Sequence, residues 1–186
     1  EVDSTLTIRD MKIPVPIIAS AMDGVVDVNF AIKMGKMGAI AVLNLEGVQT
    51  RYENATEVIQ QMVNADPDEA THLSQEIYRE PIKEKLIGQR VEEIKKAKVM
   101  TVVSAIPQRA EKFGKIAQEA GADMFVVQST IATARHIAKE YKSLDIAKFC
   151  KDMKIPVIVG NTVTYEASLE LMECGIDALL VGVGPG

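Results

Sequence analysis

The run Leu179–Gly186, LLVGVGPG, places a short apolar segment directly before a glycine-rich loop. Together with the residues before it, the stretch at 174–181 reads CGIDALLV. The same order recurs at 37–43, MGAIAVL, and at 120–127, AGADMFVV. In each copy a helical pattern ends at a glycine and the chain turns at once into an apolar strand. Repeated strand–helix units of this kind predict a parallel sheet with right-handed crossovers.

The expected strands are short, rich in Val, Ile and Leu, and almost continuously apolar. Such segments are typical of parallel strands that are covered on both faces. Two of them open with the same tetrapeptide, KIPV, at 12–15 and 154–157, where proline ends the preceding segment. We expect strands over Val15–Ala19, Ile40–Leu43, Val99–Val103, Met124–Val127, Val157–Val159 and Leu179–Val181.

Helical patterns lie between these strands, and their ends carry capping residues. Asp27 and Thr164 are placed as N-caps, and Gly38 and Gly175 follow the last turns. One further helix, Asp68–Tyr78, interrupts the alternation as an insertion between the second and third strands, and we expect its His72 at the surface. The remaining helices are expected over Val28–Met37, Ala55–Asn64, Ile82–Ala97, Arg109–Ala120, Asp145–Asp152 and Tyr165–Cys174.

Polar or small residues follow every expected strand, and this favours a barrel over an open sheet. In a (β/α)8 barrel these residues converge on the carboxyl-terminal face, whereas a doubly wound sheet concentrates its site at one switch point. No strand is followed by a complete GxGxxG motif that opens a helix. We therefore expect a (β/α)8 barrel, incomplete here, with about six of the eight strands. The residues after the strands are Ser20, Asn44, Ser104, Gln128 with Ser129, Asn161 and Gly182.

Six strands do not close an eight-stranded barrel, so two more strand–helix units are expected after Gly186. Residues 1–186 are then a single partial catalytic domain. Without the missing units the strand Leu179–Val181 is an open apolar edge, and we expect that residues 1–186 alone do not form a stable monomer.

Composition restricts the partners of the chain. The net charge of −5 argues against a nucleic-acid surface. No apolar run approaches the roughly 18 residues of a membrane helix, and no signal-peptide pattern is present, so we expect a cytoplasmic protein without a membrane partner. Cys150 and Cys174 fit no metal-binding or redox spacing and are interpreted as buried core residues.

Three motifs carry candidate chemistry. The loop at 182–186, GVGPG, lets the backbone approach a phosphate or a cation closely, although an ordinary tight turn is the alternative. In IVGNTVTYEA, at 158–167, Asn161 projects from a strand tip, or else caps its own loop. In PIIASAMDGVVD, at 16–27, Met22 either fills the core or contacts a planar base, and Asp23 can accept hydrogen bonds from loop N–H groups.

In this order and on these strands, the motifs resemble the inosine-5′-monophosphate (IMP) dehydrogenase and GMP reductase superfamily. Members carry a first-strand segment like SAAMD, a fifth-strand segment like GNVVT, and a sixth-strand loop like VGVGPG that precedes Ser and the catalytic Cys. The chain is also similar along its whole length to the IMP dehydrogenase-related branch. The segments that carry this similarity are ASAMDGVVD, VLNLEGVQTRYEN, PQRAEKF, TARHIAKEY and KFCKDMKIPVIVGN.

The resemblance implies an NAD-dependent oxidoreductase of GMP biosynthesis. Hydride passes from C2 of IMP to NAD, and a covalent intermediate on a Cys is hydrolysed to XMP. That Cys is expected just after Gly186, and neither Cys150 nor Cys174 matches it, so the chain holds no catalytic residue of this kind. A GMP reductase that uses NADPH, and a non-catalytic barrel that binds purine nucleotides, remain the alternatives.

The resemblance also implies site residues and partners. Ser20, Met22 and Asn161 match substrate positions. Gln128 stands where the family usually has an Asp that contacts the nicotinamide ribose, which puts cofactor affinity and choice in doubt. The cofactor positions are Gln128, Ser129, Thr130, Gly182, Val183 and Gly184, and the carbonyls of Gly184 and Gly186 match ligands of a monovalent cation, potassium.

Two further expectations concern organisation. Family barrels are usually homotetramers, so a homo-oligomer is expected. IMP dehydrogenases carry a regulatory module of two cystathionine-β-synthase-type repeats after the second barrel helix. Here only a short helical stretch at about 66–80 occupies that position, and GMP reductases lack the module as well.

Overall fold

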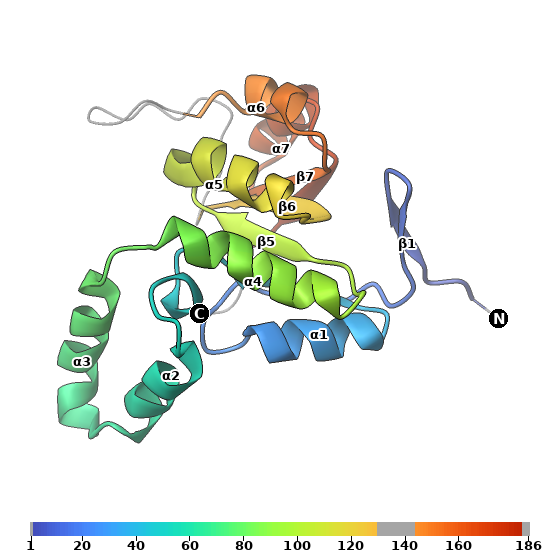
Figure 1. Ribbon diagram of the computed structural model, residues 1–186. Helices are drawn as coiled ribbons and strands as arrows, with labels where there is room; N and C mark the ends of the chain where they lie inside the picture. Colours follow the sequence, from blue (N-terminus) through green and yellow to red (C-terminus); the bar gives the residue numbers. More distant parts are fainter. Residues whose placement is uncertain (1, 130–143, 184–186) are drawn as a thin grey trace.

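A curled parallel sheet of six strands forms the centre of the chain in this computed structural model, which describes residues 2–129 and 144–183 (Figure 1). The strands lie in chain order, and each pairs in parallel with its neighbours. A doubly wound sheet would reverse its strand order at a switch point, whereas a barrel does not. The structure therefore confirms an incomplete (β/α)8 barrel. Its strands are β3 (Ile18–Ala19), β4 (Ile40–Asn44), β5 (Val102–Ala105), β6 (Met124–Gln128), β7 (Val157–Thr162) and β8 (Ala178–Val181).

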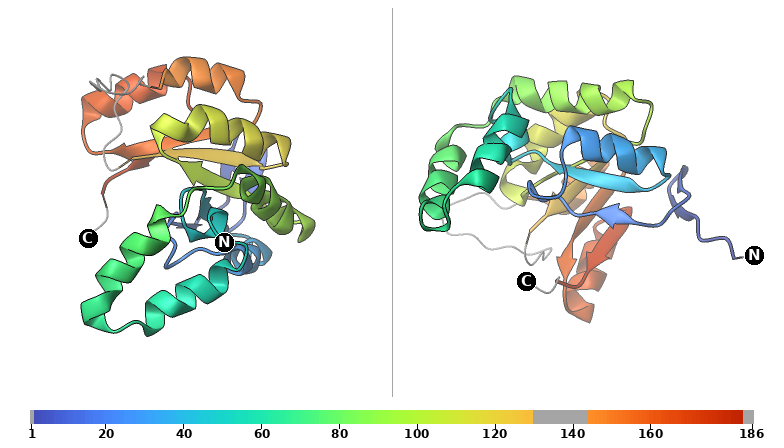
Figure 2. Two further views of the ribbon diagram at one scale, coloured as in Figure 1. Left: turned by 60° about the vertical axis from the view of Figure 1, so that its left-hand side comes forward. Right: turned by 90° about the horizontal axis from the view of Figure 1, so that it is seen from below.

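Helices cover the convex side of this sheet, as the alternating pattern predicts (Figures 1 and 2). The main apolar core lies between them and the outward-facing strand residues, such as Leu43, Val103 and Phe125. Asp27 and Thr164 cap their helices as expected, accepting from Phe30 N and Ala167 N. The helices are α1 (Val28–Lys36), α2 (Ala55–Asn64), α3 (Pro67–Arg79), α4 (Glu84–Lys96), α5 (Pro107–Glu119), α6 (Ile146–Asp152) and α7 (Tyr165–Glu173), with a 3₁₀ turn, η1 (Val48–Thr50).

A second, smaller core fills the concave side of the sheet. It consists of the alternate strand residues, such as Ile40, Val42, Val102 and Met124. An antiparallel hairpin, β1 (Leu6–Ile8) and β2 (Met11–Ile13), contributes two buried isoleucines to the same cluster. Figure 1 shows this hairpin at the opposite end of the sheet from α2 and α3. It therefore covers the amino ends of the strands and leaves their carboxyl ends open.

The first strand differs from the prediction. We expected Val15–Ala19, but only Ile18–Ala19 pairs with β4, and the KIPV segment at 12–15 ends the hairpin instead. Val15 N bonds to Gly38 O at 3.0 Å and Val15 O accepts from Ile17 N at 2.8 Å, which turns the chain before the sheet begins. The prolines at 14 and 16 have no N–H to give to a ladder.

The third strand is displaced from the expected Val99–Val103 to Val102–Ala105. Lys98 has a positive φ of 57°, and Thr101 N bonds to the carboxylate Oδ2 of Asp123 at 2.8 Å rather than to a neighbouring strand. Because of these two features, pairing with the neighbouring strands begins only at Val102.

The extra helix α3 is confirmed close to its expected bounds, and His72 on it is exposed. It packs against α2 and η1 in a small separate cluster that includes Val48, Val58 and Ile77. No helix in the described ranges, 2–129 and 144–183, combines the length and hydropathy that a membrane crossing requires.

Candidate functional site

The carboxyl ends of the six strands meet at one face, and the alternation along each strand decides which side chains reach its interior. On β4, Ile40 and Val42 face the concave core, so Asn44 does too. The ladder pairs Asn44 with Ser104, and the same alternation brings Gln128 inward at the end of β6. The inner rim is therefore polar above an apolar core, as the strand-end pattern predicts.

Ser20 and Met22 lie in the loop that leaves β3. Ile18 faces the concave core, so Ser20, two residues later, lies on the inner side at the rim. Met22 is 55% exposed and does not fill the core. Of the two interpretations of Met22, the structure favours an apolar side chain available for contact.

Asp23 fixes this loop to its neighbours. Its Oδ2 accepts from Val48 N at 2.8 Å and from the Tyr78 hydroxyl at 2.5 Å. The expectation that Asp23 accepts from a loop N–H is thereby confirmed. Burial, followed by the hydrogen bond to Asp23, raises the pKa of Tyr78 well above its ordinary value, so the phenol remains a donor at neutral pH.

Asn161 connects the end of β7 to the loop after β8. Its Nδ2 donates to Gly182 O at 2.7 Å, and Gly182 N donates to Thr162 O at 2.7 Å. The alternative of an Asn that only caps its own loop is therefore wrong, because its partner lies 21 residues away. Gly182 has a φ of 92°, a conformation that favours glycine.

The end of β6 is hydrogen-bonded to the end of β7, next to Asn161. Ser129 N donates to Gly160 O at 2.8 Å, and Asn161 N donates to Ser129 O at 3.0 Å. Gln128 is half-buried, and its amide can donate and accept but carries no charge. The structure thus brings Gln128, Ser129, Asn161 and Gly182 together at the ends of three adjacent strands.

The surroundings of Gly182 are compatible with a ligand held against the backbone. A Cβ built at this position would meet no atom of the described residues within 4 Å. Val183 beside it is exposed. The expected cofactor residues Thr130 and Gly184, and the expected cation ligand Gly186, lie outside the described residues.

Neither cysteine is placed as a nucleophile. Cys150 is buried on α6, and burial raises its pKa to about 11. Cys174 follows the last turn of α7, where its Sγ donates to Glu170 O at 3.3 Å, and burial raises its pKa as well. Since the barrel helices run back toward the amino ends of the strands, Cys174 lies at the end opposite to the candidate site. Within the described ranges no group of three or more His, Cys, Asp or Glu side chains could hold a metal ion.

Two residues of the site were not found from the sequence. Tyr78 reaches Asp23 from the inserted helix, 55 residues away in the chain. Glu46 joins the loops after β4 and β5, because its Oε1 accepts from Ile106 N at 2.9 Å. Glu46 lies in the VLNLEGVQTRYEN segment, but neither that segment nor the periodicity around Tyr78 indicates these contacts, which depend on how the loops and the inserted helix pack.

The parallel barrel sheet, with polar residues at the carboxyl ends of its strands, defines the class of (β/α)8-barrel proteins. Sequence comparison identifies the family within this class. The profile of the IMP dehydrogenase / GMP reductase domain matches residues 1–186. The chain therefore belongs to the IMP dehydrogenase / GMP reductase family. The resemblance inferred from the ASAMD, GNTVT and VGVGPG segments is confirmed.

The similar proteins agree with this assignment. A protein of Mycobacterium tuberculosis H37Rv named as an uncharacterized oxidoreductase is 32% identical over 178 residues, which cover 93% of this chain and 48% of that protein. The inosine-5′-monophosphate dehydrogenase of Cryptosporidium parvum is 28% identical over 187 residues, covering 96% of this chain and 45% of the enzyme. The crystal structure of an IMP dehydrogenase/GMP reductase-like protein from Corynebacterium glutamicum superposes with a TM-score of 0.90 at 28% identity, over 98% of this chain and 49% of that one. The chain spans about half the length of these relatives.

Proposed function

We propose that the protein containing this chain oxidises IMP to XMP with NAD as the hydride acceptor. Membership of the family and the oxidoreductase names of the relatives support an oxidation–reduction role. The observation that carries the finer proposal is the Asn161–Gly182 bond. It fixes Gly182, the first residue after β8, beside the end of β7 and next to the end of β6.

In this proposal the loop after β3 and the tip of β7 bind the substrate. Ser20 supplies a hydroxyl at the inner rim, Met22 supplies an apolar surface for the planar purine, and Asn161 orders the rim between them and Gly182. The nucleophilic Cys is expected beyond Gly186. The protein is expected to act in the cytoplasm as a homotetramer.

The cofactor side of the proposed site is built from the ends of β6 and β8. Gln128, Ser129 and Thr130 would hold the nicotinamide ribose, and Gly182, Val183 and Gly184 would line the nicotinamide. NAD supplies the hydride acceptor when it is bound. The carbonyls of Gly184 and Gly186 would hold a potassium ion, because a cage of carbonyls suits a hard cation without side-chain ligands.

The activity is tested on the full-length protein by following NADH absorbance with IMP and NAD, in potassium and in sodium buffer. We expect NADH formation that is faster in potassium. Consumption of NADPH with GMP would instead identify a GMP reductase. Saturable IMP binding without any turnover would identify the non-catalytic barrel that the uncharged Gln128 favours.

Gln128 offers a sharper test of the cofactor site. Replacement by Ala removes the hydrogen bonds to the ribose and should raise the KM for NAD about tenfold or more, with a smaller effect on the KM for IMP. Replacement by Asp restores a charged acceptor and should lower the KM for NAD. Equal effects of Gln128→Ala on the two KM values would contradict the placement of the cofactor.

A further inference from the structure

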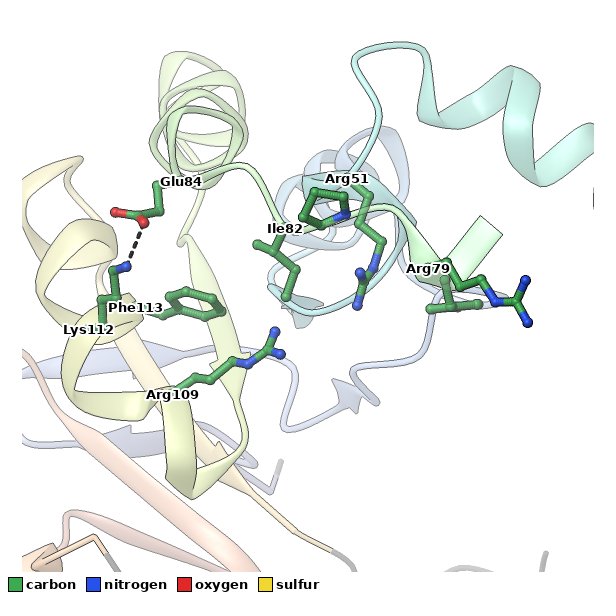
Figure 3. A pocket seen from close by; sticks show the side chains of 9 residues that line it. Arg51, Arg79, Ile82, Glu84, Arg109, Lys112 and Phe113 are labelled. Atoms are coloured by element: carbon green, nitrogen blue, oxygen red, sulfur yellow. Dashed lines mark ion pairs between the residues drawn. The ribbon is translucent and has the colours of Figure 1, made fainter. Parts of the chain in front are cut away.

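An arginine-lined pocket lies outside the ring of strand ends, where the inserted helix meets the barrel helices. Its volume is about 490 Å³, and it is bounded by the end of α3, the connection to α4, and the first turns of α4 and α5. Figure 3 shows the guanidinium groups of Arg51 and Arg109 pointing into the same space beside Ile82. Arg79 extends away at the rim, and Lys112 is turned toward Glu84.

The charge of this pocket is opposite to that of the chain. The chain carries a net charge of −5, yet the lining has three arginines and one lysine against one carboxylate. That carboxylate, Glu84, is already paired with Lys112 at 2.6 Å. Neither Arg79 nor Arg109 has a carboxylate partner among the residues that the structure describes. Clustered cations without counter-charges repel one another and attract an anion.

Arg51 is held rigidly in this pocket. Its Nε and Nη2 donate to Glu46 O at 3.2 and 3.0 Å, and its Nη1 donates to Glu80 O. The guanidinium carbon also lies 5.5 Å from the centre of the Tyr78 ring. Arg109 lies over the Phe113 ring at 5.8 Å. Because its hydrogen bonds and its ring contact fix Arg51, this residue loses little freedom when it binds a ligand. The planar guanidinium groups of Arg51 and Arg109 suit a tetrahedral oxyanion.

We propose that this pocket binds the oxyanion of a phosphate group. Its volume falls within the range of small-molecule sites, which argues for a small ligand rather than an acidic protein surface. The same chemistry could come from free phosphate or from the phosphate of a nucleotide. An occupant held by Arg51 lies one side chain, Tyr78, away from Asp23 and the loop that carries Ser20 and Met22.

Isothermal titration calorimetry of the full-length protein tests the proposal, with inorganic phosphate, IMP and NAD titrated separately. We expect Arg109→Gln to weaken phosphate-dependent binding at least about tenfold, because hydrogen bonds to a charged group are lost. Arg109→Lys, which keeps the charge but not the fork of donors, should show a smaller loss. Lys115→Gln is the matched control, since Lys115 is an exposed cation on the same helix that does not line the pocket.

The three titrations distinguish the source of the anion. A loss with inorganic phosphate shows that the free ion is sufficient, whereas a loss confined to IMP or NAD assigns the pocket to the phosphate of that nucleotide. Equal binding of all three compounds by Arg109→Gln and Lys115→Gln, or the absence of saturable binding in the parent protein, overturns the proposal. Because the readout is binding heat, failure of NADH formation does not affect this test.

Discussion

The carboxylate of Asp23 connects three separate segments of the candidate site at the scale of a single residue. One oxygen, Oδ2, accepts both from Val48 N and from the Tyr78 hydroxyl. The other oxygen, Oδ1, is buried and has no hydrogen-bond partner among the described residues. A Cβ at Gly47 would overlap this carboxylate, so glycine is needed there for close approach. Both of these hydrogen bonds to the partly buried carboxylate are therefore accepted by Oδ2.

Tyr78→Phe should destabilise the protein by about 1 kcal/mol, because a hydrogen bond to a carboxylate is lost at a partly exposed site. It should also raise the KM for IMP, because the Asp23 loop carries Ser20 and Met22. Urea denaturation and steady-state kinetics measure the two effects. Tyr165→Phe is the control, since Tyr165 is 77% exposed and its hydroxyl has no hydrogen bond within the described ranges. Equal stability of the two variants would show that the Asp23 contact contributes nothing.

The same hydroxyl predicts a dependence on pH. The pKa of Tyr78 is raised above its ordinary value of 10.0 in the folded protein, so folding favours the protonated phenol. Its contribution is fully present below pH 10 and is lost as the pH rises toward the folded pKa. The difference in unfolding free energy between the parent and Tyr78→Phe should therefore be constant from pH 7 to 9 and shrink above pH 10. A difference that grows in alkali would contradict this assignment.

The role of Asp23 as a hydrogen-bond acceptor could be predicted from the sequence, but the contact that Tyr78 makes with it could not. A carboxylate in a loop after a strand has nearby N–H groups as natural partners, so its role as an acceptor follows from local sequence. Tyr78 lies on a helix whose periodicity indicates only which face is apolar. Its contact with Asp23 depends on how the inserted helix docks, and no local pattern carries that information.

At the scale of the element, β7 and β8 approach each other closely at Gly160. A Cβ at Gly160 would lie 2.4 Å from Leu180 Cβ and 2.8 Å from the backbone oxygen of Leu180. The two strands also shift register between Gly160 and Thr162, next to the residue that bonds to Gly182. The absence of a side chain at Gly160 is what lets the end of β7 lie against β8 here.

Gly160→Ala should cost about 1–3 kcal/mol of stability, because the backbone oxygen of Leu180 cannot move without disturbing β8. It should also displace Asn161 and lower kcat/KM. Gly24→Ala is the matched control, since a Cβ at Gly24 meets no atom within 4 Å and should change stability by less than about 0.5 kcal/mol. Chemical denaturation compares them, and an unaffected Gly160→Ala would disprove the steric argument.

The helix starts capped by Asp27 and Thr164 were predicted correctly, whereas the strand starts expected at Val15 and Val99 were wrong, and the reason is physical. A helix begins where a side chain such as Asp27 or Thr164 can satisfy free N–H groups, which is a local event. A strand begins where a neighbouring strand presents N–H and C=O groups for pairing, and this depends on the tertiary structure. Val15 and Val99 have suitable side chains for a strand, yet Val15 N bonds to Gly38 O and Val99 O accepts from the Thr101 hydroxyl before the sheet starts. Hydrophobic pattern alone could not show this.

At the scale of the whole molecule, the two ends of the barrel have different roles. The hairpin covers the amino ends, and Arg9 in its turn bonds to both carboxylate oxygens of Asp177 at 2.5 and 2.8 Å. Asp177 also accepts from Val157 N at 2.8 Å, so the base of β7 is joined to the same ion pair. The closed end supports the inner core, and the polar rim at the other end is left free for ligands. The barrel could be predicted from the strand repeat, whereas the hairpin could not, because its short strands show no distinctive alternation.

Among the residues that the structure describes, β3 and β8 are the two edge strands of the sheet, and this leads to the last prediction. On β8, Val181 is 73% exposed and Leu179 and Leu180 are only partly buried. An apolar edge strand with unpaired N–H and C=O groups is a template for pairing with another chain. A polypeptide of residues 1–186 alone should therefore associate or aggregate at micromolar concentration, while the full-length protein gives a defined species. Sedimentation velocity checks this, and a soluble monomer of residues 1–186 that unfolds cooperatively would show that six strands are self-sufficient.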